Sequence, residues 1–99
     1  MIDEALDCLS DARRRRILVS LYEDCEAIDL SEFVRREDAE SGQLRIKITH
    51  VHLPKLEAYG YVRWDRNEGE VWKGPDYDEV APVVELLHEN RKELPEGWL

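Results

Sequence analysis

Hydrophobic positions near the start of the chain recur with the period of an α-helix. Four apolar side chains between residues 17 and 22 fall on one helical face, and Ser10 precedes them as a typical N-cap residue. We therefore predict a first full helix over residues 11–23, after a short helical lead-in over residues 3–9. Downstream of this helix, Ile28 is predicted to be a short extended step.

A second, shorter helix is predicted over residues 30–37. Asp29 can cap its N-terminus, and three apolar residues recur at helical spacing along it. Charged residues and Gly42 then predict a turn over residues 38–43. The apolar residues that this helix is expected to bury are Leu30, Phe33 and Val34.

The next segment matches two structural templates. Residues 44–49 alternate between apolar and polar, as a strand does, yet the apolar residues from there onward also repeat at helical spacing. Pro54 disfavours an unbroken helix because it lacks a backbone donor, whereas Gly60 is a typical signal for a helix C-terminus. We predict one helix over residues 43–59, with Pro54 as the place for any kink.

A β-hairpin is predicted after this helix. Residues 61–66 alternate and are rich in aromatic side chains, residues 67–69 have the composition of a turn, and residues 70–73 alternate again. Gly74 and Pro75 end the second strand.

A final helix is predicted after the hairpin. Asp76 and Glu79 resemble a capping pair, and the valine and leucine residues between 80 and 87 supply an apolar face. We expect the helix to end near Glu93, with Pro82 either in its first turn or at a kink. The order of helices, hairpin and helix predicts a single domain of the α+β class over residues 1–99.

The distribution of charge points to one segment. The chain has a formal net charge of −9, with 23 acidic and 14 basic residues spread along it, and most of the basic residues are arginine. This composition indicates a protein from a salt-loaded cytoplasm, where screening acts over about 3 Å at molar salt and only local charge matters. Residues 41–56 contain Arg45, Lys47 and Lys55 but no acidic residue. We interpret this stretch as a surface for an anionic partner, with nucleic acid as the candidate.

Other functional classes find little support in the sequence. No apolar run approaches the roughly 18 residues that span a membrane, and residues 1–9 lack the basic start of a signal peptide, so we expect a cytoplasmic protein. No nucleophile, phosphate-binding or metalloprotease motif occurs, and we expect neither an enzyme nor a cofactor. Cys8 and Cys25 are predicted to be small buried hydrophobic residues. His50 and His52 would share a face only on a strand and lack a third ligand, so no metal site is predicted.

Three stretches carry a resemblance to a known family: ALDCLSDARRRRILVSLYE, DLSEFVRRE and THVHLPKLEAYGYVRWD. They resemble archaeal winged helix-turn-helix domains similar to ArsR-like regulators, and a VHLPKL segment followed by glycine recurs in small haloarchaeal winged-helix domains. The resemblance covers a core of about residues 5–92 and leaves a short tail over residues 93–99. It implies three helices, a two-stranded hairpin wing and a C-terminal helix, in a transcriptional regulator that binds double-stranded DNA.

In that architecture the helix over residues 43–59 enters the major groove, and its exposed side chains either read bases or merely solvate the helix. Lys55 and the pair Arg35 and Arg36 suit phosphate contacts, although the acidic neighbours of the pair make local ion pairing an alternative. The predicted base-reading residues are Gln43, Arg45, Lys47, Thr49 and His50.

The predicted wing gives mixed evidence. Arg63, Arg66 and Lys73 are basic, but Glu68 and Glu70 near the tip disfavour contact with phosphates. The four arginines over residues 13–16 point around more than one helical turn, so we expect ion pairs on the first helix and not one DNA-binding patch.

The resembled family also suggests a homodimer through the first and last helices. The predicted interface residues are Val80, Val83, Val84, Leu87 and Trp98, where Trp98 could instead dock on its own domain. The alternative function is a protein interaction module that does not bind DNA, with an exposed patch made of Trp72, Tyr77 and Trp98.

Overall fold

The computed structural model describes residues 2–24, 26–37 and 42–99, and over these it shows an α+β fold of helices around a small antiparallel sheet. This confirms the predicted class and is compatible with a winged-helix-like arrangement. Among the described residues no helix combines the length and the apolar character needed to cross a bilayer. In chain order the elements are α1 (Ile2–Leu9), α2 (Ala12–Glu23), β1 (Ile28–Asp29), α3 (Leu30–Glu37), α4 (Gly42–Lys47), the π-helical segment η1 (Ile48–His52), α5 (Leu53–Ala58), β2 (Val62–Asp65), β3 (Glu70–Lys73) and α6 (Tyr77–Glu89).

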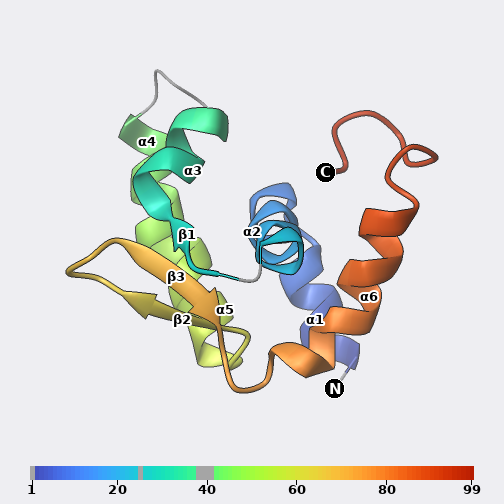
Figure 1. The fold of residues 1–99 in the computed structure, drawn as a ribbon, viewed down its shortest axis with the longest axis horizontal. Coiled ribbons are helices and arrows are strands. Elements are labelled where there is room, and N and C mark those ends of the chain that lie inside the picture. Colours follow the sequence, from blue (N-terminus) through green and yellow to red (C-terminus); the bar gives the residue numbers. More distant parts are fainter. Residues whose placement is uncertain (1, 25, 38–41) are drawn as a thin grey trace.

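The sheet has the strand order β1-β3-β2, so the predicted hairpin gains a third strand (Figure 1). Within the hairpin Trp64 is paired with Val71, and on the other side Val71 is paired with Ile28 of β1. The extended step predicted at Ile28 is therefore an edge strand. A hydrogen bond of 2.8 Å from the backbone N–H of Leu30 to the carbonyl of Gly69 joins the start of α3 to the hairpin turn.

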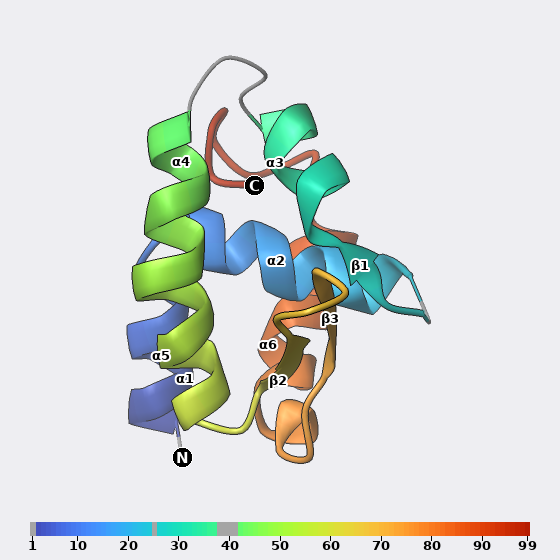
Figure 2. The same cartoon turned by 90° about the vertical axis from the view of Figure 1, so that its left-hand side faces the viewer.

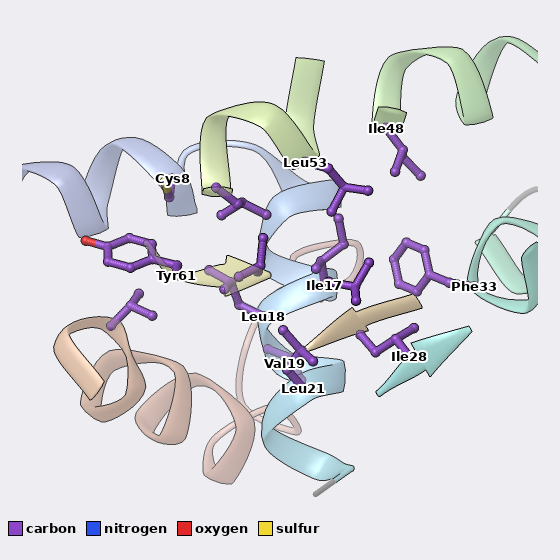
Figure 3. Packing of buried hydrophobic residues seen from close by; sticks show 14 of the residues in the cluster. Cys8, Ile17, Leu18, Val19, Leu21, Ile28, Phe33, Ile48, Leu53 and Tyr61 are labelled. Carbon is purple, nitrogen blue, oxygen red and sulfur yellow. The ribbon is translucent and has the colours of Figure 1, made fainter. Parts of the chain in front are cut away.

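The hydrophobic core lies around α2, which passes through the middle of the molecule (Figures 1 and 3). Leu18 and Leu21 of α2 are completely buried, and α5 and α6 contribute fully buried residues such as Leu53 and Val84. Burying one such aliphatic side chain contributes about 1.5–3 kcal/mol. Tyr77, at the start of α6, ties the same core together because its hydroxyl donates to the carbonyl of Leu18 at 2.9 Å.

The segments α4, η1 and α5 form one continuous helix along the outer side of the molecule (Figure 2), which we call the long helix. The single helix predicted over this region is confirmed, and the strand alternative is wrong. The departure from regular α-helix in this region is the π-helical segment η1, directly before Pro54, where the N–H of Leu53 bonds to the carbonyl of Ile48. These wider turns lie directly before Pro54, where an α-helical turn would press the proline ring against a backbone carbonyl.

Gly60 ends the long helix as predicted. It has a φ of +78°, a left-handed conformation that favours glycine, and the N–H of Tyr61 bonds back to the carbonyl of Leu56 at 3.0 Å.

The helix boundaries required some corrections. Asp11, and not Ser10, caps α2, because its carboxylate accepts a hydrogen bond from the backbone N–H of Arg13 at 2.8 Å. Ser10 instead donates its hydroxyl to the carbonyl of Asp7. The cap predicted at Asp29 is confirmed by a bond of 3.2 Å from the N–H of Glu32.

The last helix is shorter than predicted. Asp76 occupies the N-cap position of α6, but its side chain makes no capping hydrogen bond, so the predicted capping pair is wrong. The helix ends at Glu89, and tighter turns follow up to residue 94.

Candidate nucleic-acid interface

The exposed face of the long helix carries Gln43, Lys47 and His50. Helical periodicity puts these side chains on one side because they follow each other at intervals of three or four residues. Two aliphatic residues share this side: Ile46 is 58% exposed and Val51 is 52% exposed. The opposite side of the helix buries Leu44, Ile48, His52, Leu53 and Leu56 against the core.

Arg45 and Thr49, which were predicted to read bases beside these residues, are held elsewhere. The guanidinium of Arg45 donates to the hydroxyl of Ser31 on α3 at 3.1 Å. The hydroxyl of Thr49 donates to the carbonyls of Arg45 and Ile46, at 2.9 and 3.2 Å. The structure therefore divides the five predicted base-reading residues into three on the exposed face and two with partners inside the protein.

Lys55 was predicted to contact phosphate, and the structure gives it a partner on α1. Its ammonium lies 2.8 Å from a carboxylate oxygen of Asp7, and the hydroxyl of Tyr59 donates to the same oxygen at 3.0 Å. The hydrogen bonds from Lys55 and Tyr59 lower the pKa of Asp7, so the carboxylate stays charged and the pair stays formed. Lys55 thus holds the long helix to α1 and is not a free cation.

Arg35 and Arg36, at the end of α3, are both exposed. Arg36 lines a cleft between α2, α3, α6 and the C-terminal tail, which is described below. Its predicted neighbour Asp38 lies outside the described residues. Arg35 therefore keeps its assignment as a candidate phosphate contact, whereas Arg36 belongs to the cleft.

The three basic residues predicted on the wing have different environments. Arg66 bonds to the carboxylate of Glu57 at 3.0 Å and lies 4.1 Å over the ring of Trp64. The ammonium of Lys73 lies 5.1 Å from the ring centroid of Tyr77. Arg63 is exposed, and within the described part of the chain it has no ion pair.

We predicted that the arginines over residues 13–16 form ion pairs on the first helix. The structure corrects this, because their side chains bond mostly to backbone carbonyls. Arg15 donates to the carbonyls of Leu9 and Trp98, at 2.7 and 2.9 Å. Arg16 lies 3.7 Å from the carboxylate of Glu37 and donates to the carbonyl of Gly97 at 3.3 Å. These side chains mainly satisfy backbone carbonyls at helix ends and in the tail.

Arg14 is the most buried of the four, with only 7% of its surface exposed. Its guanidinium donates to the carbonyl of Cys8 at 2.9 Å and to the carbonyl of Asp7 at 3.2 Å. A third bond of 3.1 Å reaches Nδ1 of His52 on the long helix. Because arginine has donors only, Nδ1 of His52 accepts this bond and its proton lies on Nε2, 3.8 Å from the carboxylate of Asp11.

This network fixes the position of the long helix relative to α1 and α2. Burial lowers the pKa of His52, and the positive charges of Arg14, Arg13 and Lys47 lower it further, against the opposing effect of Asp11. His52 therefore remains neutral near pH 7, which is the form that Arg14 needs.

Because of His52, we expect the free energy of unfolding to decrease as the pH is lowered. A group whose pKa is lower in the folded state stabilises the fold fully above its unfolded value, and that contribution is lost as the pH falls below about 6.5. Urea unfolding at pH 7.5, 6.5 and 5.5 should show this loss in the wild type, with a slope of at most about 1.4 kcal/mol per pH unit. His52→Gln keeps an acceptor for Arg14 and should flatten the pH dependence over this range.

The matched control for this experiment is His50→Gln, because His50 is exposed on the same helix. It should keep the wild-type pH dependence. Identical slopes for the wild type and His52→Gln would contradict the assignment.

The predicted dimer interface is only partly at the surface. Val80 and Val84 are completely buried in the core of the chain itself, so their assignment to an interface is wrong. Val83 and Leu87 are partly buried against the same core. On the outer sides of α1 and α6, which lie next to each other (Figure 1), other apolar residues are exposed: Ile2 at 66%, Leu6 at 53% and Leu86 at 61%.

The aromatic patch proposed for the alternative function is also divided. Tyr77 is buried, which is a correction, while Trp72 is 37% exposed on the hairpin and Trp98 is 49% exposed in the tail. The tail does dock on the domain, through the backbone carbonyls of Gly97 and Trp98 and through Leu99, which packs against the core.

Cys8 is completely buried, as predicted, and burial raises the pKa of its thiol to about 11. This thiol is therefore protonated and unreactive at neutral pH. Cys25 lies outside the described residues. Within the described part of the chain, no group of three His, Cys, Asp or Glu side chains is arranged to hold a metal ion.

These features define a small α+β domain with an acid-free helical face, flanked by α3 and a hairpin. Residues 6–72 match the family described as a domain of unknown function, DUF7344, and the chain belongs to this family. The match runs from the second half of α1 into β3 and includes the long helix. No curated protein and no solved structure matches the chain.

Sequence reasoning missed three features of the site. The exposure of Ile46 and Val51 could have been found, because both positions fall outside the arc of buried residues on a helical wheel. The pairing of Asp7 with Lys55 and of Arg14 with His52 had no local signal, since each pair joins helices far apart in the chain.

Proposed function

We propose that this protein is a DNA-binding transcriptional regulator of the winged helix-turn-helix type, related to the ArsR-like regulators that its sequence resembles. In this proposal α3 and the long helix form the helix-turn-helix, and β2 and β3 form the wing. The observation that carries the proposal is the exposed face of the long helix. It presents Gln43, Lys47 and His50, and residues 41–56 contain no acidic residue, in a chain with a formal net charge of −9. Glu57, near the end of the helix, is bonded to Arg66 of the hairpin.

The position and dimensions of the long helix support this function. Gly42–Ala58 makes a helix of about 25 Å at 1.5 Å per residue, and it lies on the outer side of the molecule (Figure 2). A helix in this position can enter the major groove, which is about 12 Å wide. The Arg14–His52 bond connects this helix to α2, and the Lys55–Asp7 pair connects it to α1. Precise base recognition requires such support of the recognition helix.

The charges predict a modest electrostatic contribution to binding. Lys47 and Arg35 are exposed cations near the proposed groove-facing surface, and Arg63 is a third on the hairpin. If each releases one phosphate counterion, the logarithm of the affinity should fall with the logarithm of salt concentration with a slope of about −3 for one protomer. Such a weak salt dependence suits a protein that works in a salt-loaded cytoplasm.

The proposal includes a homodimer, because one protomer reads only one half-site. The exposed residues Ile2, Leu6 and Leu86 on the adjacent helices α1 and α6 support an apolar contact between two copies. These exposed residues, and not the buried Val80 and Val84, are therefore the candidates for a contact between two copies.

The proposal is tested by enriching a duplex from a random DNA pool and measuring its binding by fluorescence anisotropy in potassium chloride. Lys47→Gln should weaken binding about threefold to tenfold and reduce the salt slope by about one, because one phosphate or base contact is lost. Its melting temperature should not change, since Lys47 is exposed.

The control is Lys92→Gln, an exposed lysine beyond the end of α6, which should bind DNA as the wild type does. The proposal would be contradicted if no duplex were enriched from the pool. It would also be contradicted if Lys47→Gln and Lys92→Gln lost the same amount of DNA affinity.

A second candidate function, a protein interaction module, is favoured by the exposure of Ile46 and Val51 on the same helical face. Exposed aliphatic side chains that lie on one face can form the apolar centre of a surface that docks another protein. In that case no duplex is enriched, and Ile46→Ser, but not Lys47→Gln, abolishes cross-linking of the protein to its partner in cells.

A further inference from the structure

A cleft lies on a different side of the molecule from the exposed face of the long helix. It is bounded by α2, α3, α6 and the tail that returns from α6 (Figure 1), and its volume is about 570 Å³. Sites for small molecules usually have volumes between about 300 and 1,000 Å³. The cleft is therefore large enough for a small organic molecule.

Part of the cleft is apolar. Val19 of α2 and Phe33 of α3 line it, and these side chains are almost completely covered by the rest of the protein. Leu94, Pro95 and Leu99 add apolar surface from the tail. A hydrocarbon body of a ligand would find contacts here from three separate segments of the chain.

The charged groups around the cleft are not all paired. Glu37 lies 3.7 Å from Arg16, and Glu23 lies 3.9 Å from His88, so two carboxylates already have basic partners. Arg36 and Arg91, however, have no carboxylate partner within the described part of the chain. Arg91 donates only to the backbone carbonyl of His88, at 2.7 Å.

Two guanidinium groups that have no carboxylate partner among the described residues, at the edge of a partly apolar cleft, complement an anionic head group. Guanidinium binds carboxylates well because its planar donors can form two parallel hydrogen bonds. Glu96 also lies at the cleft and would repel a second negative charge, which favours a ligand with a single one. From this combination we propose that the cleft binds a small organic monoacid with an apolar body, whose carboxylate is held by Arg36 and Arg91 and whose body lies against Phe33 and Val19.

The C-terminal tail forms one side of this site and is held in place by hydrogen bonds. Arg15 donates to the carbonyl of Trp98 and Arg16 to the carbonyl of Gly97, so α2 holds the tail in place through its backbone. A bound acid would join α3 to the segment after α6. This is an effector site separate from the proposed DNA-binding face, and it stands whether or not that face binds DNA.

The test is a titration of the ¹⁵N-labelled protein with octanoate, followed by amide chemical shifts at constant salt. Octanoate should produce saturable shifts at Ser20, Phe33 and Leu99, which line the cleft. Octylammonium, with the same body and the opposite charge, should bind more weakly, and octan-1-ol should bind with intermediate affinity. Arg36→Gln and Arg91→Gln should each weaken octanoate binding about threefold to tenfold, because each removes a charge-assisted hydrogen bond at a partly exposed site.

The matched control is Arg35→Gln, because Arg35 is the exposed neighbour of Arg36 and does not line the cleft. It should bind octanoate as the wild type does. Octylammonium binding as tightly as octanoate would overturn the proposal, as would shifts confined to the apolar residues Ile2, Leu6 and Leu86. The absence of saturation would overturn it as well. The comparison of the three ligands uses the wild type, so it does not depend on the folding of a variant.

Discussion

Replacing Arg14 with methionine is expected to lower the free energy of unfolding by about 2–4 kcal/mol. The substitution keeps an unbranched side chain of similar length but removes the guanidinium. The carbonyl of Cys8 and Nδ1 of His52 then lose their donor inside the protein, and a buried polar group without a partner costs about 1–3 kcal/mol. For a domain of this size the melting temperature should fall by about 4–8 °C for each kcal/mol lost.

In the proposed function, this change should also weaken DNA binding. Arg14 connects the end of α1 to the π-helical turns of the long helix, so its loss leaves His52 free to change rotamer. The long helix would then be held to α1 mainly by the Lys55–Asp7 pair, which is partly exposed. DNA affinity at a temperature where the variant is still folded should therefore also decrease.

The control is Arg13→Met in the same arginine run. The side chain of Arg13 has no hydrogen bond or ion pair in the described part of the chain, so its replacement should change the unfolding free energy by less than about 0.5 kcal/mol. Urea unfolding at pH 7.5 measures both variants. Equal effects in the two would show that the arginine run acts through its total charge and not through the buried bonds of Arg14.

The difference between these two arginines shows what the sequence could and could not predict. Periodicity located the helices because an amphipathic helix must bury one face, and that requirement is visible in any window of the chain. It also placed the hairpin, whose alternation and turn residues are local signals. The partner of Arg14, however, lies 38 residues away, and no local pattern distinguishes the arginine that turns inward from its neighbours.

The long helix shows how two local signals compete. Pro54 argued for a break and Gly60 for a continuous helix, and the structure satisfies both with a π-helical segment. This solution depends on the tertiary burial of Ile48 and Leu56, which stabilises the helix on both sides of the proline. Intrinsic preference alone does not reveal such a compromise.

The candidate site could be predicted less well than the fold. The acid-free segment, which is read directly from the sequence, includes the exposed helical face that we propose as the site. Which cations on it are free depends on contacts with other elements, as Arg45 with Ser31 and Lys55 with Asp7 show. The strand β1 was only an extended step in the sequence, since two residues are too few for a periodic pattern.

Replacing Gly74 with alanine is the second change for which a large effect is expected, a loss of about 2–4 kcal/mol in the free energy of unfolding. Gly74 lies directly after β3, where the chain leaves the sheet towards α6. A β-carbon at this position would collide with the backbone carbonyl of Gly60 and would lie 2.8 Å from the backbone nitrogen of Val62. Real β-carbons essentially never approach other atoms this closely.

The collision is costly because the atoms on both sides are backbone. The N–H of Gly74 bonds to the carbonyl of Tyr61 at 2.9 Å, and the N–H of Asp76 bonds to the carbonyl of Gly60 at 2.8 Å. Relieving the contact would break one of these bonds and separate the end of the long helix from the start of α6. The long helix carries the proposed DNA-binding face, and α6 contributes to the proposed dimer contact and to the cleft.

The matched control is Gly42→Ala at the start of α4, where a β-carbon would meet no atom within 4 Å. Alanine is favoured over glycine in a helix by about 0.5–1 kcal/mol, so this variant should be as stable as the wild type or more stable. Thermal and urea unfolding of both variants measure the difference. If Gly74→Ala unfolded within about 0.5 kcal/mol of the wild type, the chain between β3 and α6 could move aside without loss, and the tight packing of this junction would not be needed to hold the long helix and α6 together.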